Sequence, residues 1–242
     1  MAPGATRRGG ARPRFLLPTL AAGAFGVMAL WVAATPAAGH TTTGGHSPTA
    51  ASRVSPPPVA PAGGQTLADQ TVPGSAPPGC DWQLVDAVAV PASAAAGPAD
   101  VTGGIPAGFA HSPTGALVAA VQIGFRLETE PNFAALTAAD VADTPGKAKF
   151  LQVASALDVT NPPDPAPGTY LQLAGFQFVS YTPAAAVVQI LTARPDGTFQ
   201  VSTLTVVWAD SDWKLVLGAT GTESPDQQVV ASTVGFIVWG GV

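Results

Sequence analysis

Charged side chains are scarce in this sequence. Asp, Glu, Lys and Arg make up 10 % of its 242 residues, against about a quarter in an ordinary soluble domain. Glycine (27 residues) and proline (25 residues) are instead abundant. This composition indicates a globular part joined to a part that builds no core.

Cysteine and histidine are almost absent. Cys80 is the single cysteine, which excludes an intrachain disulfide and a metal site built from thiolates. The lone thiol could pair between two chains outside the cytoplasm, but a partly shielded thiol is the simpler interpretation. Of the three histidines, His40 and His46 lie in a Pro-rich stretch that is typical of solvated side chains.

Basic residues are rare in the second part of the chain. From Cys80 onward there are five Lys and Arg against fourteen Asp and Glu, a net charge of −9. Because an acidic surface repels phosphate, we expect no direct binding of nucleic acid.

Motifs that carry chemistry are also missing. We find no nucleophile elbow, no phosphate-binding glycine loop and no metal-ligand spacing. His111 could serve as a base in a pocket, and its candidate partners are Asp140, Glu128, Glu130 and Tyr181. No spacing requires this arrangement, and a histidine beside a Ser-Pro helix start is more typical of a local hydrogen-bond partner. We therefore predict no enzyme activity, no catalytic residues, no metal site and no cofactor.

Residues 1–39 predict a membrane anchor. A basic tail, 1–14, holds four arginines and precedes an uncharged run at 15–39. Leu16 to Ala34 has about the ~20 residues that cross a bilayer, and the arginines place the N-terminus in the cytoplasm. We predict an uncleaved single-pass protein of the cell membrane whose C-terminal domain is extracellular. The alternative is a signal peptide cleaved after Val32-Ala33-Ala34, which would give a secreted protein.

Residues 40–79 predict a disordered linker. The segment holds eight prolines and no Ile, Phe, Tyr, Trp or Met, so it cannot bury enough apolar surface to offset the entropy of ordering it. The predicted extracytoplasmic domain is therefore 80–242.

The first half of this domain predicts one strand and three helices. Asp81 to Val90 alternates as a strand does, and 91–108 reads as a Pro/Gly-rich loop. Proline then stands at three helix starts, where its missing N–H costs nothing: Ser112-Pro113, Glu130-Pro131 and Thr144-Pro145. Ser112 and Thr144 are expected to cap their helices through their side chains.

The second half predicts a sheet. Gly175 to Leu217 contains four apolar runs separated by turns too short for anything but hairpins. We therefore expect an α+β fold, three helices packed on a curved four-stranded antiparallel meander, with Trp213 and Leu215 in its core. Ser224-Pro225-Asp226-Gln227 fits a capping box and predicts a short helix to about Ser232.

The chain ends in an apolar stretch. An exposed strand of this kind would be an aggregation hazard, so we expect it to be docked. Its large apolar residues are the candidate partner-docking residues: Phe236, Val238 and Trp239.

Three helices before a meander that closes on Asp212-Trp213-Lys214-Leu215 resemble the nuclear transport factor 2-like fold. With an anchor in front, the chain resembles the bitopic assembly component of type IV secretion systems, whose extracytoplasmic domain has that fold. This resemblance implies membrane attachment and partners within a transfer apparatus.

Four motifs carry a second resemblance: Cys80-Asp81-Trp82, 108–116 (GFAHSPTGA), 176–183 (FQFVSYTP) and 238–241 (VWGG). They are similar to those of an uncharacterised membrane-anchored protein family found among conjugation genes of integrative elements in high-GC Gram-positive bacteria. Together with the anchor, the linker and the acidic domain, this resemblance favours a non-catalytic, membrane-tethered scaffold subunit of a conjugative DNA transfer apparatus whose partners are other proteins of that apparatus. A second copy of the chain is a further partner to consider. The alternatives are a small-molecule or lipid-binding domain and an isomerase- or dehydratase-like enzyme.

Overall fold

A computed structural model describes residues 69–129, 132–154, 170–222, 224 and 227–241. The predicted tail, the anchor and most of the linker lie outside these residues. No helix within the described ranges is long and apolar enough to cross a membrane.

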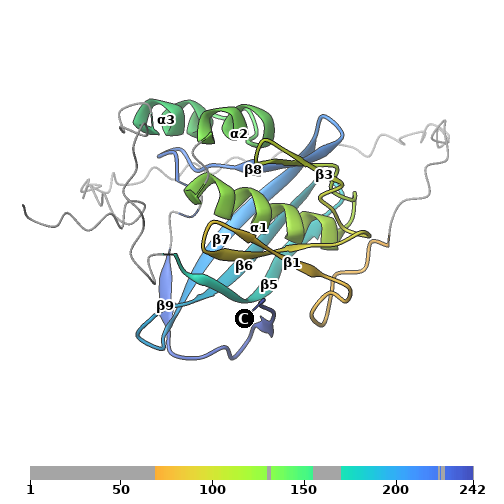
Figure 1. The fold of residues 1–242 in the computed structure, drawn as a ribbon, viewed down its shortest axis with the longest axis vertical. Helices are drawn as coiled ribbons and strands as arrows, with labels where there is room; N and C mark the ends of the chain where they lie inside the picture. The colour runs from red at the N-terminus through yellow and green to blue at the C-terminus, as the bar shows by residue number, and fades with distance from the viewer. Residues whose placement is uncertain (1–68, 130–131, 155–169, 223, 225–226, 242) are drawn as a thin grey trace, which may run out of the picture.

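A six-stranded sheet forms the centre of the domain (Figure 1). Four of its strands follow one another as antiparallel neighbours, as predicted for Gly175 to Leu217: β5 (Gln172–Thr182), β6 (Ala185–Ala193), β7 (Phe199–Ala209) and β8 (Asp212–Val216). Two short strands complete it. β9 (Gln228–Val230) pairs with the start of β7, and β10 (Ile237–Val238) pairs with β5.

The predicted fold class is wrong. The described residues form ten strands in three sheets, so the domain is β-rich rather than three helices on a four-stranded meander. The additional strands are β9, β10 and two hairpins that pack outside the main sheet: β1 (Asp81–Val85) with β2 (Val88–Ala92), and β3 (Asp100–Thr102) with β4 (Ile105–Ala107).

The described part of the chain contains three helices: α1 (Pro113–Thr129), α2 (Phe133–Asp140) and α3 (Pro145–Ala154). The predicted starts at Pro113 and Pro145 are confirmed. Ser112 caps α1, because its Oγ accepts a hydrogen bond from the Gly115 N–H (3.1 Å). Thr144 does not cap α3 in this way, since its buried hydroxyl has no hydrogen-bond partner among the described residues.

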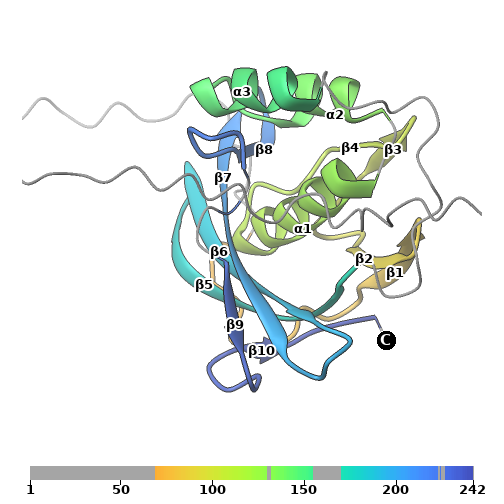
Figure 2. The same ribbon diagram turned by 90° about the vertical axis from the view of Figure 1, so that its left-hand side faces the viewer.

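The helix α1 lies between the sheet and the hairpin β1–β2 (Figure 2). It is buried on all sides rather than along one stripe, and its residues from Ala116 to Val121 are each 0 % exposed. A helix that is apolar around its whole circumference has to be enclosed in this way. Gly115 permits the entry of α1 into the core, because a Cβ there would lie 1.9 Å from the Ala110 carbonyl oxygen.

Three local predictions need correction. The strand predicted for Asp81 to Val90 is the hairpin β1–β2, which turns at Asp86, a residue with φ +50°. The loop predicted for 91–108 contains the hairpin β3–β4. The helix predicted from Ser224 is replaced by β9, and the Ser224 Oγ accepts a hydrogen bond from the Thr203 N–H of β7 (2.8 Å) rather than one within a helix.

Candidate interaction surface

Eight rings form a continuous aromatic chain through the domain. Each ring lies 3.9 to 6.4 Å, centroid to centroid, from another, a separation at which aromatic pairs attract one another. In order along the chain these rings belong to Trp82, Trp239, Phe176, Phe178, Tyr181, Trp213, His111 and Trp208.

The four distinctive sequence motifs meet in this aromatic chain. Trp82, His111, Phe176 and Trp239 each come from a different motif. The Trp213 Nε1–H donates to the Ala110 carbonyl (2.9 Å) and ties the motif 108–116 to β8. Each motif therefore contributes at least one ring to the packing of the domain.

His111 belongs to this packing. Its ring stacks on Trp208 at 3.9 Å with the planes 4° apart, and its Nε2 lies 2.6 Å from the Pro183 carbonyl oxygen. Its own carbonyl accepts a hydrogen bond from Gln70, whose Oε1 accepts the Tyr181 hydroxyl. No carboxylate contacts the His111 ring within the described residues, so the structure does not assemble the candidate His-carboxylate pair. Glu130 lies outside the described residues.

Asp140 is instead part of a buried charged group between α2 and β8. It is 2 % exposed, and its Oδ1 lies 3.6 Å from the Lys214 Nζ. Desolvation raises the pKa of Asp140 to about 6, although Lys214 acts in the opposite direction. Nearby, the Asp212 carboxylate accepts hydrogen bonds from the backbone N–H groups of Gly108 (2.7 Å) and Phe109 (3.1 Å). The Asp140 carboxylate thus links α2 to β8. The Asp212 carboxylate links β8 to the segment that precedes α1.

Cys80 is half-buried, and its Sγ lies 3.5 Å from the Pro77 carbonyl oxygen. Burial raises the pKa of the thiol, which disfavours the reactive thiolate. This agrees with the partly shielded thiol inferred from the sequence. The described residues hold no group of three His, Cys, Asp or Glu side chains placed to bind a metal ion.

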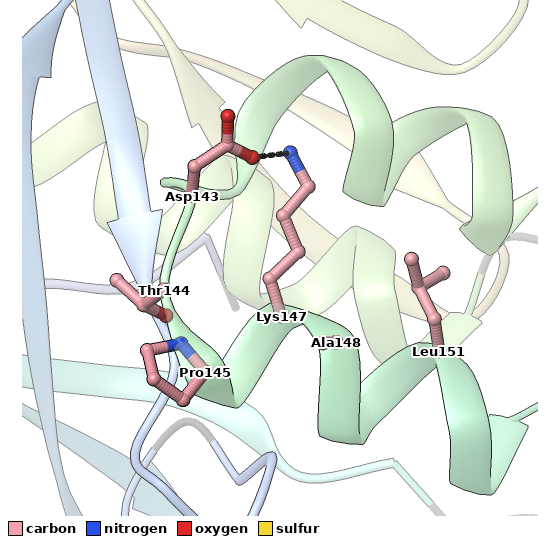
Figure 3. Close-up of a pocket in the computed structure, with 6 residues that line it drawn as sticks. All are labelled: Asp143, Thr144, Pro145, Lys147, Ala148 and Leu151. Carbon is pink, nitrogen blue, oxygen red and sulfur yellow. Dashed lines mark hydrogen bonds and ion pairs between the residues drawn. The ribbon is translucent and has the colours of Figure 1, made fainter.

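Two hollows differ in size and setting. An open groove of about 440 Å³ lies along the start of α3, where the Lys147–Asp143 ion pair (2.9 Å) stands one turn from Leu151 (Figure 3). A smaller hollow of about 60 Å³ lies between α1 and the strands β6 and β7. It has room for only a few water molecules.

The three candidate docking residues have different surroundings. Trp239 is 4 % exposed and packs between Trp82 and Phe176, so its ring is not available to a partner. Phe236 is half-buried, and Val238 is 66 % exposed.

Two further exposed valines were missed from the sequence. Val229 is 61 % exposed and Val234 is 85 % exposed, and both lie in the segment for which a helix was predicted or just after it. We call Val229, Val234 and Val238 the C-terminal valines. They belong to β9, β10 and the loop between them, at the end of the molecule opposite α2 and α3 (Figure 2).

Comparison with known protein families matches residues 45–238 to the family described as "Domain of unknown function (DUF8175)". No curated protein and no solved structure matches the chain. The matched residues cover most of the predicted linker and nearly all of the described domain. The chain therefore belongs to the DUF8175 family.

Proposed function

We propose that the protein is a non-catalytic scaffold, tethered to the membrane by residues 15–39, that holds partner proteins together outside the cell. Following the resemblance of its sequence motifs, we assign this scaffold to a conjugative, type IV secretion-like DNA transfer apparatus. The filled interior of the domain is the observation that carries the non-catalytic part of the proposal.

The inner face of the sheet is occupied by the protein itself. The helix α1 and the aromatic chain cover it, and the hollow beneath α1 measures about 60 Å³. Sites for small molecules usually enclose about 300–1,000 Å³. A lipid-binding domain or an isomerase-like enzyme would need such a cavity, so these alternatives have less support. The groove beside α3 is large enough but is open to solvent and lies outside the sheet.

If the interior is filled, contacts with other proteins are made by the outer surface of the domain. The C-terminal valines present apolar side chains on a domain whose charge is strongly acidic. Burial of apolar surface at the core of an interface contributes favourably to its binding free energy. A tether at the membrane raises the effective concentration of the attached partners, which is what a scaffold requires.

The test is a double substitution, Val234→Asp with Val238→Asp, in the full-length protein of a conjugating host. We expect transfer of the host element to fall about tenfold or more, the effect of losing ~1.4 kcal/mol of binding free energy. The matched control is Val153→Asp, because Val153 is also exposed (44 %) but belongs to α3 at the other end of the molecule. Equal transfer by the parent, the double variant and the Val153→Asp strain, with the three proteins folded and present in equal amounts, would contradict the proposal.

A further inference from the structure

The hollow beneath α1 has an acidic opening. We call it the Glu128 niche, and two kinds of residues line it. The polar ones are Glu128, Thr192, Gln200 and Ser202, and the larger apolar ones are Phe125, Leu171, Ile190 and Leu204. Glu128 is exposed whereas Thr192 is 7 % exposed, so the carboxylate lies on the solvent side and the hydroxyl lies deeper.

Two polar groups of the lining, the Glu128 carboxylate and the Ser202 hydroxyl, are available to a ligand. The Thr192 hydroxyl donates to the Gln200 carbonyl (3.3 Å), and the Gln200 Oε1 accepts a hydrogen bond from Arg194 (3.4 Å). Within the described ranges, neither the Glu128 carboxylate nor the Ser202 hydroxyl has a hydrogen-bond partner. The niche therefore offers acceptor oxygens and an apolar lining but no free cation of its own.

We propose that the Glu128 niche receives the ammonium or guanidinium group of a basic side chain on a partner protein, an inference that rests on the scaffold function proposed above. A volume of about 60 Å³ admits the head of one side chain and not a whole small molecule. A carboxylate forms charge-assisted hydrogen bonds with such a head, and an aromatic residue such as Phe125 adds attraction for a cation.

The charges around the niche favour a basic ligand. Burial, followed by the charges of Asp86 and Glu128, raises the pKa of Tyr170, which places two carboxylates near this phenol. Arg194 is the cation on the sheet side, and it is also paired with Asp196 (3.6 Å). On α1, Arg126 donates to Gln122 (2.9 Å) and to the Gly104 carbonyl (3.3 Å). The domain as a whole is acidic, so a basic partner is attracted from a distance as well.

The protonation state of Glu128 gives the proposal a pH signature. Although the side chain is exposed at the opening, the protein atoms packed around its carboxyl desolvate it and raise its pKa to about 7. The charged fraction of Glu128 therefore rises as the pH increases from 6 to 8. A bound cation stabilises the charged form, so its affinity should rise over the same interval.

The experiment uses full-length protein in detergent with 13C-labelled Ile, Leu and Val methyl groups. Titration with n-butylammonium at pH 8 should shift the signals of Leu171, Ile190 and Leu204 and leave that of Val153 in place. The affinity should be weaker at pH 6 than at pH 8. The uncharged analogue n-butanol should produce no such shift.

Two variants test the residues of the niche. Glu128→Gln should abolish the pH dependence and weaken binding, whereas the control Asp143→Asn, which removes an exposed carboxylate from the start of α3, should bind as the parent does. Ser202→Leu should block the niche while Glu128 remains in place. Shifts with n-butanol equal to those with n-butylammonium, or Glu128→Gln binding with parental affinity and pH dependence, would overturn the proposal.

The source of the amine is tested separately. Putrescine binding about tenfold or more tightly than N-acetyl-lysine methylamide would show that the niche is built for a free diamine and would overturn the assignment to a partner side chain. These readouts do not depend on DNA transfer. An unaffected transfer frequency in the valine variants would therefore overturn the scaffold function without changing the measured amine chemistry, and the absence of butylammonium binding would overturn the niche alone.

Discussion

Among the described residues, Trp213 holds together several separate segments of the chain. It is 0 % exposed, and its ring contacts Tyr181, Trp208 and His111. Its Nε1–H is bonded to the carbonyl of Ala110 at the entry to α1. One side chain therefore joins β5, β7, β8 and the segment before α1.

Trp213→Ala should lower the free energy of unfolding by about 3–5 kcal/mol, the usual cost of removing a buried tryptophan. Urea unfolding followed by circular dichroism measures this change. Val153→Ala on the surface of α3 is the control and should change stability by less than about 0.5 kcal/mol. A Trp213→Ala variant as stable as this control would show that the ring is not part of the core.

His111→Ala should leave conjugative transfer unchanged. The ring stacks on Trp208, meets Trp213 edge-on and contacts the Pro183 carbonyl, so its loss removes two aromatic pairs, each worth about 0.5–1.5 kcal/mol of stability. Transfer frequency and thermal unfolding, measured side by side, check both parts. A loss of transfer at unchanged stability would mean that His111 acts in a reaction, against the non-catalytic proposal.

At the scale of secondary-structure elements, the structure separates local signals from tertiary ones. The helix starts at Pro113 and Pro145 could be predicted because a proline at the first helical position acts within a few residues. The hairpin β3–β4 also carried a local signal, since Gly103 and Gly104 both have positive φ and form the turn that such a pair favours. That signal was overlooked in a segment rich in glycine and proline.

The segment after Ser224 could not be assigned from local sequence. Its spacing fits a helix cap, but the Ser224 hydroxyl accepts the backbone N–H of Thr203 on a neighbouring strand. Val229 and Val230 then extend the edge of β7 as β9. A contact with a residue 21 positions away along the chain decided between helix and strand, and no periodicity within the segment contains that information.

The contact between α2 and β8 should make stability depend on pH. The pKa of Asp140 is raised to about 6 in the folded protein from its ordinary 3.8, so the folded state binds this proton more tightly than the unfolded state does. The contribution of Asp140 to stability is therefore fully present below pH 3.8 and is lost as the pH rises through 6. A shift of this size corresponds to on the order of 3 kcal/mol.

Asp140→Asn isolates this contribution. Relative to the variant, the parent should gain stability as the pH falls from 7.5 to 4.5. Asp140→Asn also removes the ion pair with Lys214 at neutral pH, so the pH dependence of the difference, and not its size at one pH, is the readout. Urea unfolding at several pH values measures the difference between the two curves. Parallel curves over this range would mean that Asp140 titrates normally.

At the scale of the whole molecule, the most distinctive parts of the sequence are used to build the fold. The four motifs converge on the aromatic chain, and Trp239, predicted to dock a partner, packs within it. Sequence reasoning identified the apolar C-terminus but could not tell which of its side chains face inward, because this depends on the register of β10 on β5. Val238 was a candidate from the sequence and is exposed in the structure, whereas the exposed Val229 and Val234 became candidates only through the structure.

The acidic, filled domain has a clear requirement if it acts as a scaffold, namely attachment to the membrane. A tethered domain holds its partners at a high local concentration, and a domain released from the membrane loses this advantage even when it folds normally. We therefore expect that replacing residues 1–39 with a cleavable signal peptide releases a folded domain and abolishes transfer of the host element. Protease resistance and thermal unfolding of the released form check its folding, and mating assays check transfer. Transfer at the parental frequency from the released form would contradict the scaffold proposal, because a freely diffusing domain that suffices for function needs no tether.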